Sequence, residues 1–181
     1  MQRRKFIASA AALASVAAAP EVFAGNNPKP FVVKAGEARF GVHTPFKGVN
    51  PNDLKISGKD TNGQLAVFEY TGHVKEGPVL HVHYDQDEIF IVVEGRYRFR
   101  VGEKEEVLEA GDTLFLPRKI PHTWIQLTDY GKLIFMVQPA GRMEEFFLRM
   151  NELKGPPSEE EFQKITMAHG MKNVGPALSL E

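Results

Sequence analysis

Residues 79–88 read VLHVHYDQDE and place two histidines, His81 and His83, two positions apart in an apolar run. Side chains of a β-strand alternate between its two faces, so both imidazoles are expected on one face of a strand. Glu88 follows after a short polar segment that is long enough for a turn into the next strand, and His122 begins a later apolar run. Three imidazoles and one carboxylate form a competent ligand set for one divalent metal ion.

The sequence on both sides of this stretch alternates short apolar, β-branched runs with Gly, Pro, Asn and Asp. Many short strands at this spacing predict a mainly β protein, a sandwich or a barrel. The expected strands are Phe31–Val33, Leu54–Ile56, Leu65–Tyr70, Val79–His83, Glu88–Val93, Arg96–Val101, Val107–Leu108, Thr113–Leu116, His122–Leu127 and Leu133–Gln138.

A helical pattern replaces the strand pattern after Pro139. Apolar residues recur at helical spacing over Met143–Leu153, and two of them are the adjacent phenylalanines Phe146 and Phe147. Ser158, with a glutamate three residues on, is typical of a helix N-cap, and a second helix is expected to run to about His169. We expect the aromatic side chains of this helix to pack against the barrel core. A lid over a site and a homodimer interface remain alternatives.

The first 24 residues have the pattern of a secretory signal rather than of a fold. Arg3 and Arg4 precede a short apolar run from Phe6 to Ala19, which is typical of a bacterial twin-arginine signal. Small residues at the cleavage positions favour a cut after Ala24. We therefore expect a periplasmic or secreted protein without stable membrane insertion after cleavage. The rest, residues 25–181, has the length of one domain.

The composition excludes several classes of function. The chain has 181 residues with 43% hydrophobic and 25% charged residues and a net charge of −1, so it offers no electrostatic footprint for nucleic acid. It contains no cysteine, which excludes disulfides, a thiolate nucleophile and cysteine-based zinc sites. Any metal chemistry must therefore use histidine, aspartate and glutamate.

The spacing around the first two histidines resembles a motif of the cupin superfamily, G-x5-H-x-H-x3–4-E-x6-G. His81, His83, Glu88 and Gly95 match its later part, whereas Lys75 stands at the position of the leading glycine. Within that superfamily the sequence is similar to the small, single-domain cupins of the quercetin 2,3-dioxygenase type.

The second cupin motif has the form G-x5-P-x-G-x2-H-x3-N. Gly111, Pro117 and His122 match it, but Lys119 replaces its middle glycine and Gln126 replaces its asparagine. Both departures lie outside the ligand set, so they affect the expected turn and pocket wall more than the expected metal.

The resemblance implies a cupin-type jelly-roll barrel over about residues 31–140, followed by a C-terminal helical segment at 141–181. It also implies His81, His83, Glu88 and His122 as the ligands of one divalent transition metal ion. Iron, manganese, nickel, cobalt, copper and zinc all accept this ligand set.

Strand parity predicts the walls of a substrate pocket beside the metal. Phe90 shares a strand face with the glutamate ligand, and Trp124 and Gln126 share a face with the third histidine. Tyr97 and Phe99 are expected to join them. Aromatic walls with few polar groups suit a flat organic ligand, although Trp124 and Phe99 are equally compatible with plain barrel core.

The resemblance favours a metal-dependent dioxygenase that acts on a flavonol- or phenol-like small molecule with dioxygen. In that interpretation Glu88 is the catalytic general base. Two alternatives stay open: a non-oxidative cupin isomerase or lyase that uses the same metal as a Lewis acid, and a non-catalytic periplasmic ligand-binding cupin.

Overall fold

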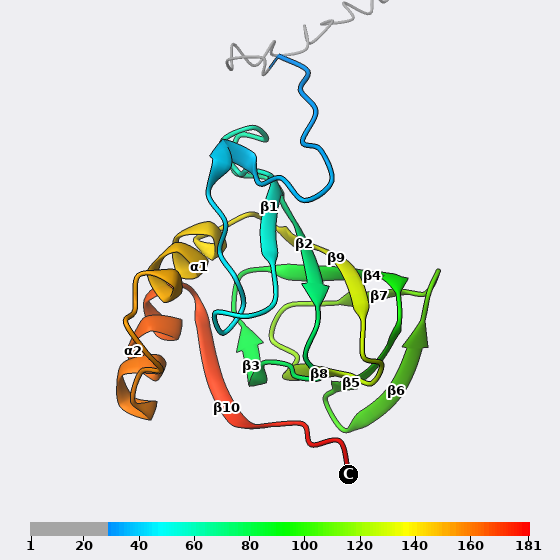
Figure 1. The fold of residues 1–181 in the computed structure, drawn as a ribbon. Helices are drawn as coiled ribbons and strands as arrows, with labels where there is room; N and C mark the ends of the chain where they lie inside the picture. The colour runs from blue at the N-terminus through cyan, green and yellow to red at the C-terminus, as the bar shows by residue number, and fades with distance from the viewer. Residues whose placement is uncertain (1–28) are drawn as a thin grey trace, which may run out of the picture.

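The computed structural model describes residues 29–181, which form two five-stranded antiparallel sheets (Figure 1). The first sheet has the strand order β1-β2-β9-β4-β7, and the second has the order β10-β3-β8-β5-β6. The strands of the first sheet are β1 (Asn52–Ile56), β2 (Ala66–Gly72), β4 (Asp87–Glu94), β7 (Thr113–Leu116) and β9 (Gly131–Gln138). Those of the second are β3 (Val79–His83), β5 (Arg96–Val101), β6 (Lys104–Glu109), β8 (His122–Gln126) and β10 (Met171–Ala177). The predicted jelly-roll architecture is confirmed.

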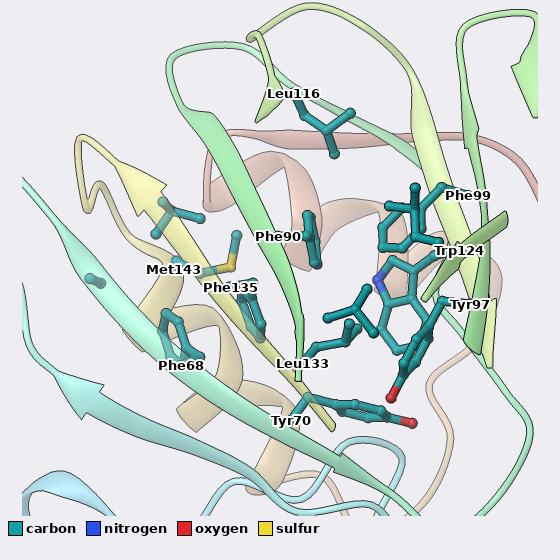
Figure 2. Packing of buried hydrophobic residues seen from close by; sticks show 14 of the residues in the cluster. Phe68, Tyr70, Phe90, Tyr97, Phe99, Leu116, Trp124, Leu133, Phe135 and Met143 are labelled. Atoms are coloured by element: carbon teal, nitrogen blue, oxygen red, sulfur yellow. The ribbon is translucent and has the colours of Figure 1, made fainter. Parts of the chain in front are cut away.

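The core lies between the two sheets and is rich in aromatic rings (Figure 2). Phe90 on β4 and Phe99 on β5 meet edge to face across the sheets, with ring centroids 5.2 Å apart. Phe68 and Phe135 stack on neighbouring strands at 4.9 Å. Burial alternates along β4 as strand parity predicts, because every second side chain faces the opposite sheet.

Two helices follow the last strand of the first sheet: α1 (Met143–Asn151) and α2 (Glu159–Ala168). The Ser158 hydroxyl accepts a hydrogen bond from the Glu161 backbone N–H at 3.2 Å, so the expected N-cap is present. Phe147 of α1 packs against the barrel, with its ring 5.1 Å from that of Phe68. A short 3₁₀ helix, η1 (Arg39–Gly41), precedes β1.

Two sequence-based assignments are wrong. Phe31–Val33 forms no strand: Val32 is 77% exposed, and the Phe31 ring lies under the Arg39 guanidinium instead of in a sheet. The predicted C-terminal helical segment ends in a strand, β10, which pairs with β3. Gly175 and Pro176 hide this strand in the sequence, but an edge strand tolerates a proline and shifts in register because one side of its backbone needs no partner.

The remaining expectations concern export and oligomeric state. The proposed signal at residues 1–24 falls outside the described residues, and nothing in the fold tests the homodimer. Among residues 29–181, no helix is both long and apolar enough to cross a bilayer.

Candidate metal centre

The four predicted ligands converge on one point between the sheets. His81, His83, Glu88 and His122 each offer a ligand atom, and these atoms all lie within 4.8 Å of one another. His81 and His122 are directly opposite each other on β3 and β8, with ring centroids 4.5 Å apart. Glu88 comes from β4 in the other sheet, and its carboxylate lies 3.5 Å from Nε2 of His83 and 2.7 Å from Nε2 of His122.

Hydrogen bonds at the far nitrogens orient all three imidazole rings. Nδ1 of His81 lies 2.8 Å from the Val79 carbonyl oxygen, and Nδ1 of His122 lies 3.0 Å from the Ile120 carbonyl oxygen. A carbonyl oxygen only accepts hydrogen bonds, so each Nδ1 carries the proton and each Nε2 keeps its lone pair in the neutral ring. Such fixed tautomers are typical of histidines that bind a metal.

The third ring, that of His83, is held by a side chain. Its Nδ1 lies 3.3 Å from Oε1 of Gln86. The amide nitrogen of Gln86 donates to the carbonyl oxygens of Pro139 and Ala140 at 3.2 and 2.7 Å, which fixes the amide orientation. Oε1 of Gln86 therefore faces His83 as an acceptor, and Nε2 of His83 is left to face the other ligands.

The ligand atoms fit a cation because they are buried and otherwise unsatisfied. Nε2 of His83, Nε2 of His122 and Oε2 of Glu88 have no hydrogen-bond partner outside the cluster among the described residues. These three residues are at most 4% exposed. Orphaned buried polar atoms cost about 1–3 kcal/mol each. A divalent ion at their centre would satisfy all of them at once, so the residues present fit the metal that the fold class implies.

The charge states of the cluster also suit a cation. Burial lowers the pKa of His81 to about 3 and also lowers the pKa of His83. Burial alone would raise the pKa of Glu88, but the imidazoles of His83 and His122 lower it to about 2. For His122, Glu88 raises the pKa although burial opposes it. Glu88 is therefore ionised near neutral pH, and a buried negative charge among imidazoles suits a bound cation.

A cavity of about 700 Å³ opens beside the cluster. His81, His83 and Glu88 line it, while His122 lies 2% exposed behind them. The cavity extends toward α1, α2 and the loop before β1. Its aromatic wall residues are Phe46, Tyr70, Phe90, Trp124, Phe135, Phe146, Phe147 and Phe162.

The structure divides the predicted pocket residues into two groups. Phe90 and Trp124 line the cavity. Tyr97, Phe99 and Gln126 point inward as strand parity indicates, but each is at most 1% exposed and lies in the filled part of the barrel. The rings of Tyr97 and Phe99 pack on Trp124 at 5.7 and 6.4 Å. These three residues therefore support the cavity wall rather than form it.

The two departures at motif glycines have structural explanations. Lys119 adopts a φ of +70°, the left-handed conformation that glycine favours, and its backbone N–H donates to the His83 carbonyl oxygen at 2.7 Å. Gly77, two residues after Lys75, passes so close to β8 that a Cβ there would lie 1.7 Å from the Trp124 carbonyl oxygen. Gly77 therefore supplies the close backbone approach that Lys75 does not.

Several residues of the site carried no recognisable signal in the sequence. Gln86 lies in the segment between the ligands, but its role depends on carbonyl groups more than 50 positions away. Phe46 belongs to the loop before β1 and reaches the cavity through contacts with Tyr70 and Trp124 at 6.0 and 6.2 Å. Met171 on the unexpected strand β10 lies opposite His83. Only the packing brings these positions together.

Comparison with known proteins agrees with this geometry. The two sheets form a jelly roll of the cupin fold, and its His-His-Glu-His cluster is a candidate metal centre. Residues 67–137, which include all four ligands, match the family model described as cupin domain. Over these residues the chain is similar to cupin domains.

Two curated proteins are similar to the chain over part of their length. Quercetin 2,3-dioxygenase of Bacillus subtilis (strain 168) is 26% identical over 123 residues, which cover 68% of this chain and 35% of that enzyme. An uncharacterized protein of Methanocaldococcus jannaschii is 36% identical over 44 residues, or 24% of this chain and 35% of that protein. The chain therefore spans about a third of the length of these relatives.

Solved structures share the fold at low sequence identity. An RmlC-like cupin from Shewanella frigidimarina has 22% identity and a TM-score of 0.51, covering 63% of this chain and 95% of its own. KdgF from a Halomonas species has 13% identity and the same TM-score, covering 61% of this chain and 94% of its own. At these identities the likeness shows the fold alone.

Proposed function

We propose that this protein is an exported, metal-dependent dioxygenase that acts on a small aromatic substrate of the flavonol or phenol type. One observation carries the proposal: a buried cluster of unsatisfied His and Glu ligands opens on an aromatic-walled cavity of about 700 Å³. The similarity to a quercetin 2,3-dioxygenase supports the reaction type.

The histidines would hold the ion, and the cavity would hold the substrate. A bound divalent ion would supply Lewis-acid chemistry, which lowers the pKa of a substrate hydroxyl. Glu88, which is ionised and lines the cavity, would accept the proton of that hydroxyl. Phe90 and Trp124 contact the flat faces of the substrate and exclude water.

The overall reaction needs no external reductant. Both atoms of dioxygen enter the substrate. The substrate ring supplies the electrons that reduce dioxygen and is itself oxidised. The cavity walls need only admit dioxygen and hold the activated ring in place, which is consistent with their largely apolar character.

Export rests on the N-terminal sequence. Arg3, Arg4 and the apolar run that follows support a twin-arginine route with cleavage after Ala24. Fractionation of the native host with intact-mass measurement tests this part. A periplasmic protein that retains Met1–Ala24, or a protein confined to the cytoplasm, would contradict it.

Oxygen uptake tests the activity. The protein is loaded in turn with each of the six candidate metals, and oxygen consumption is followed with quercetin and with simple catechols, using His83→Ala as the control. We expect uptake that requires the metal, with both oxygen atoms of ¹⁸O₂ recovered in the product. Conversion without oxygen uptake would favour an isomerase or lyase, and binding without conversion would favour a ligand-binding protein.

A further inference from the structure

Apart from the metal cluster and the Tyr70 hydroxyl, the described cavity wall holds one further buried polar side chain with unused hydrogen-bonding capacity, that of Asn52. Asn52 is 2% exposed and lines the cavity wall, yet its Nδ2 has no partner anywhere in residues 29–181. A buried amide donor without a partner costs about 1–3 kcal/mol. The fold therefore maintains an unfavourable group at this place in an otherwise largely apolar wall.

The neighbouring residues show that the Asn52 side chain faces inward. Asp53, on the opposite face of β1, is engaged by Nδ1 of His43 at 2.9 Å, and Leu54, on the same face as Asn52, packs against the core. The Thr44 hydroxyl donates to the backbone carbonyl of Asn52 at 2.7 Å. This contact fixes the backbone and leaves the side-chain amide free.

Asn50, two residues earlier, is an asparagine with a structural role in this fold. Asn50 is fully buried, and its Oδ1 accepts hydrogen bonds from the backbone N–H groups of His73 and Val74 at 2.7 and 3.1 Å. Its Nδ2 donates to the Glu76 carboxylate at 2.7 Å. Asn50 therefore links two loops, whereas Asn52 links nothing.

The position of Asn52 relative to the metal cluster indicates which end of a bound molecule it would contact. Trp124 lies two residues after His122 on β8, or about 7 Å along the strand. The ring centroids of Trp124 and Tyr70 lie 5.0 Å apart, and Tyr70 is the cross-strand partner of Asn52. The cavity wall thus runs from the metal centre past two aromatic rings to a free amide.

The Tyr70 hydroxyl is a second polar group of this wall without a hydrogen-bond partner among residues 29–181, but it points away from the cavity. Figure 2 shows the Tyr70 hydroxyl close to that of Tyr97, in the filled part of the barrel. The ring of Tyr70 contributes to the cavity, but its oxygen lies with Tyr97. Asn52 is therefore the polar group of this part of the wall that is placed to meet a ligand.

We propose that the Asn52 amide donates a hydrogen bond to a substrate oxygen at the end remote from the cluster of His81, His83 and Glu88. This inference rests on the proposed function and refines its substrate class: an elongated aromatic molecule with oxygen functions at both ends. The rings stack between the aromatic walls, one oxygen faces the metal centre, and the other satisfies Asn52. Asn52 is thus a specificity-determining residue.

The first test compares Asn52→Leu with Asn50→Leu in thermal unfolding of the ligand-free protein. Leucine has the same number and branching of side-chain heavy atoms as asparagine, and it removes the polar group. We expect Asn50→Leu to lower the melting temperature by several degrees and Asn52→Leu to leave it unchanged or raise it. An equal loss in both variants would make Asn52 a structural residue and overturn the proposal.

The second test measures binding without turnover. Zinc-loaded protein is titrated without oxygen with quercetin and with 3-hydroxyflavone, which lacks the remote hydroxyls, and quenching of Trp124 is followed because it is the one tryptophan of the chain. Asn52→Leu is expected to weaken quercetin binding roughly five- to tenfold and to leave 3-hydroxyflavone binding unchanged.

The outcomes separate this proposal from the proposed function. Equal weakening of both flavones by Asn52→Leu, or no weakening of either, overturns the role of Asn52 alone. Failure of the wild-type protein to bind either flavone overturns both the aromatic substrate class and the role of Asn52. If Asn52→Leu weakens quercetin binding as predicted but the wild type consumes no oxygen, the role of Asn52 is supported and the dioxygenase activity is contradicted.

Discussion

Gln86 connects the His83 ligand to the junction between the barrel and α1. One end of its amide accepts from the His83 ring, and the other end donates to the carbonyl oxygens of Pro139 and Ala140. Gly141 passes close to this amide, since a Cβ there would lie 2.7 Å from Nε2 of Gln86. The orientation of a ligand in the first half of the domain thus depends on backbone more than 50 residues later.

Replacing Gln86 by leucine should weaken metal binding. The variant removes the acceptor that fixes the Nδ1–H tautomer of His83, and loss of such a supporting contact typically costs 10- to 100-fold in metal affinity. Competition with a chromophoric chelator measures the change. Gln64→Leu, at an exposed position, is the matched control and should bind metal like the wild type. Equal affinities in all three proteins would show that Gln86 does not support the ligand.

Replacing His83 by alanine should abolish the metal site. We expect about one metal ion per wild-type chain and far less in the variant, measured by elemental analysis after purification. Added metal should raise the melting temperature of the wild type, because a ligand at 100 times its Kd stabilises by about 2.7 kcal/mol, but it should not raise that of the variant. His73→Ala, an exposed histidine outside the cluster, serves as control. Full metal content in His83→Ala would contradict the ligand assignment.

Replacing Glu88 by glutamine should affect turnover more than metal binding. The amide keeps the size and one oxygen ligand but cannot accept a proton, so the rate should fall by roughly two to four orders of magnitude. Metal content and kcat are measured on the same preparation. Near-normal turnover would reduce Glu88 to a dispensable ligand and leave the chemistry to the metal and the substrate.

Replacing Lys119 by glycine should stabilise the protein. Lys119 is exposed and holds a φ of +70°, which costs a non-glycine residue more than it costs glycine. After the larger chain entropy of unfolded glycine is subtracted, we expect a gain of about 0.5–1 kcal/mol in the free energy of unfolding. Denaturant titration measures it. Lys119→Ala removes the side chain but keeps the unfavourable φ, so a similar gain in that variant would contradict the explanation.

Replacing Gly77 by alanine should destabilise the barrel. The added Cβ would lie 1.7 Å from the Trp124 carbonyl oxygen, and that oxygen belongs to a central strand that cannot easily move. We expect a loss of about 1–3 kcal/mol. Gly155→Ala is the control, because no heavy atom lies within 4 Å of a Cβ at that glycine. A Gly77→Ala variant as stable as the control would mean that β8 yields to the new methyl group.

The sequence alone determined the parts of this protein that depend on local periodicity and spacing. His81 and His83 share a strand face because β-strands repeat every two residues. The spacing to Glu88 and His122 predicted the other two members of the cluster, and Ser158 marked the start of a helix. Each of these features depends on residues close in the chain or on a motif of fixed spacing, so one chain was enough to find them.

Strand parity alone does not predict which inward-facing side chains line the cavity. It correctly sends Tyr97, Phe99 and Trp124 toward the interior, but it does not say which part of the interior is filled. That depends on the volumes of side chains from both sheets and from α1, and on how they pack together. Only the folded arrangement leaves Trp124 on a cavity and encloses the other two.

The tertiary structure also decided every feature made by contacts between distant segments. Strand β10 forms because the free edge of β3 offers backbone partners to Met171–Ala177, a stretch whose glycine and proline predict no strand. Gln86 supports His83 only because the chain after β9 returns beside it. Nδ2 of Asn52 has no partner within residues 29–181 only because folding buries it in a largely apolar wall. Hydrogen bonds and burial of this kind belong to the packed molecule, so neither composition nor spacing can encode them in recognisable form.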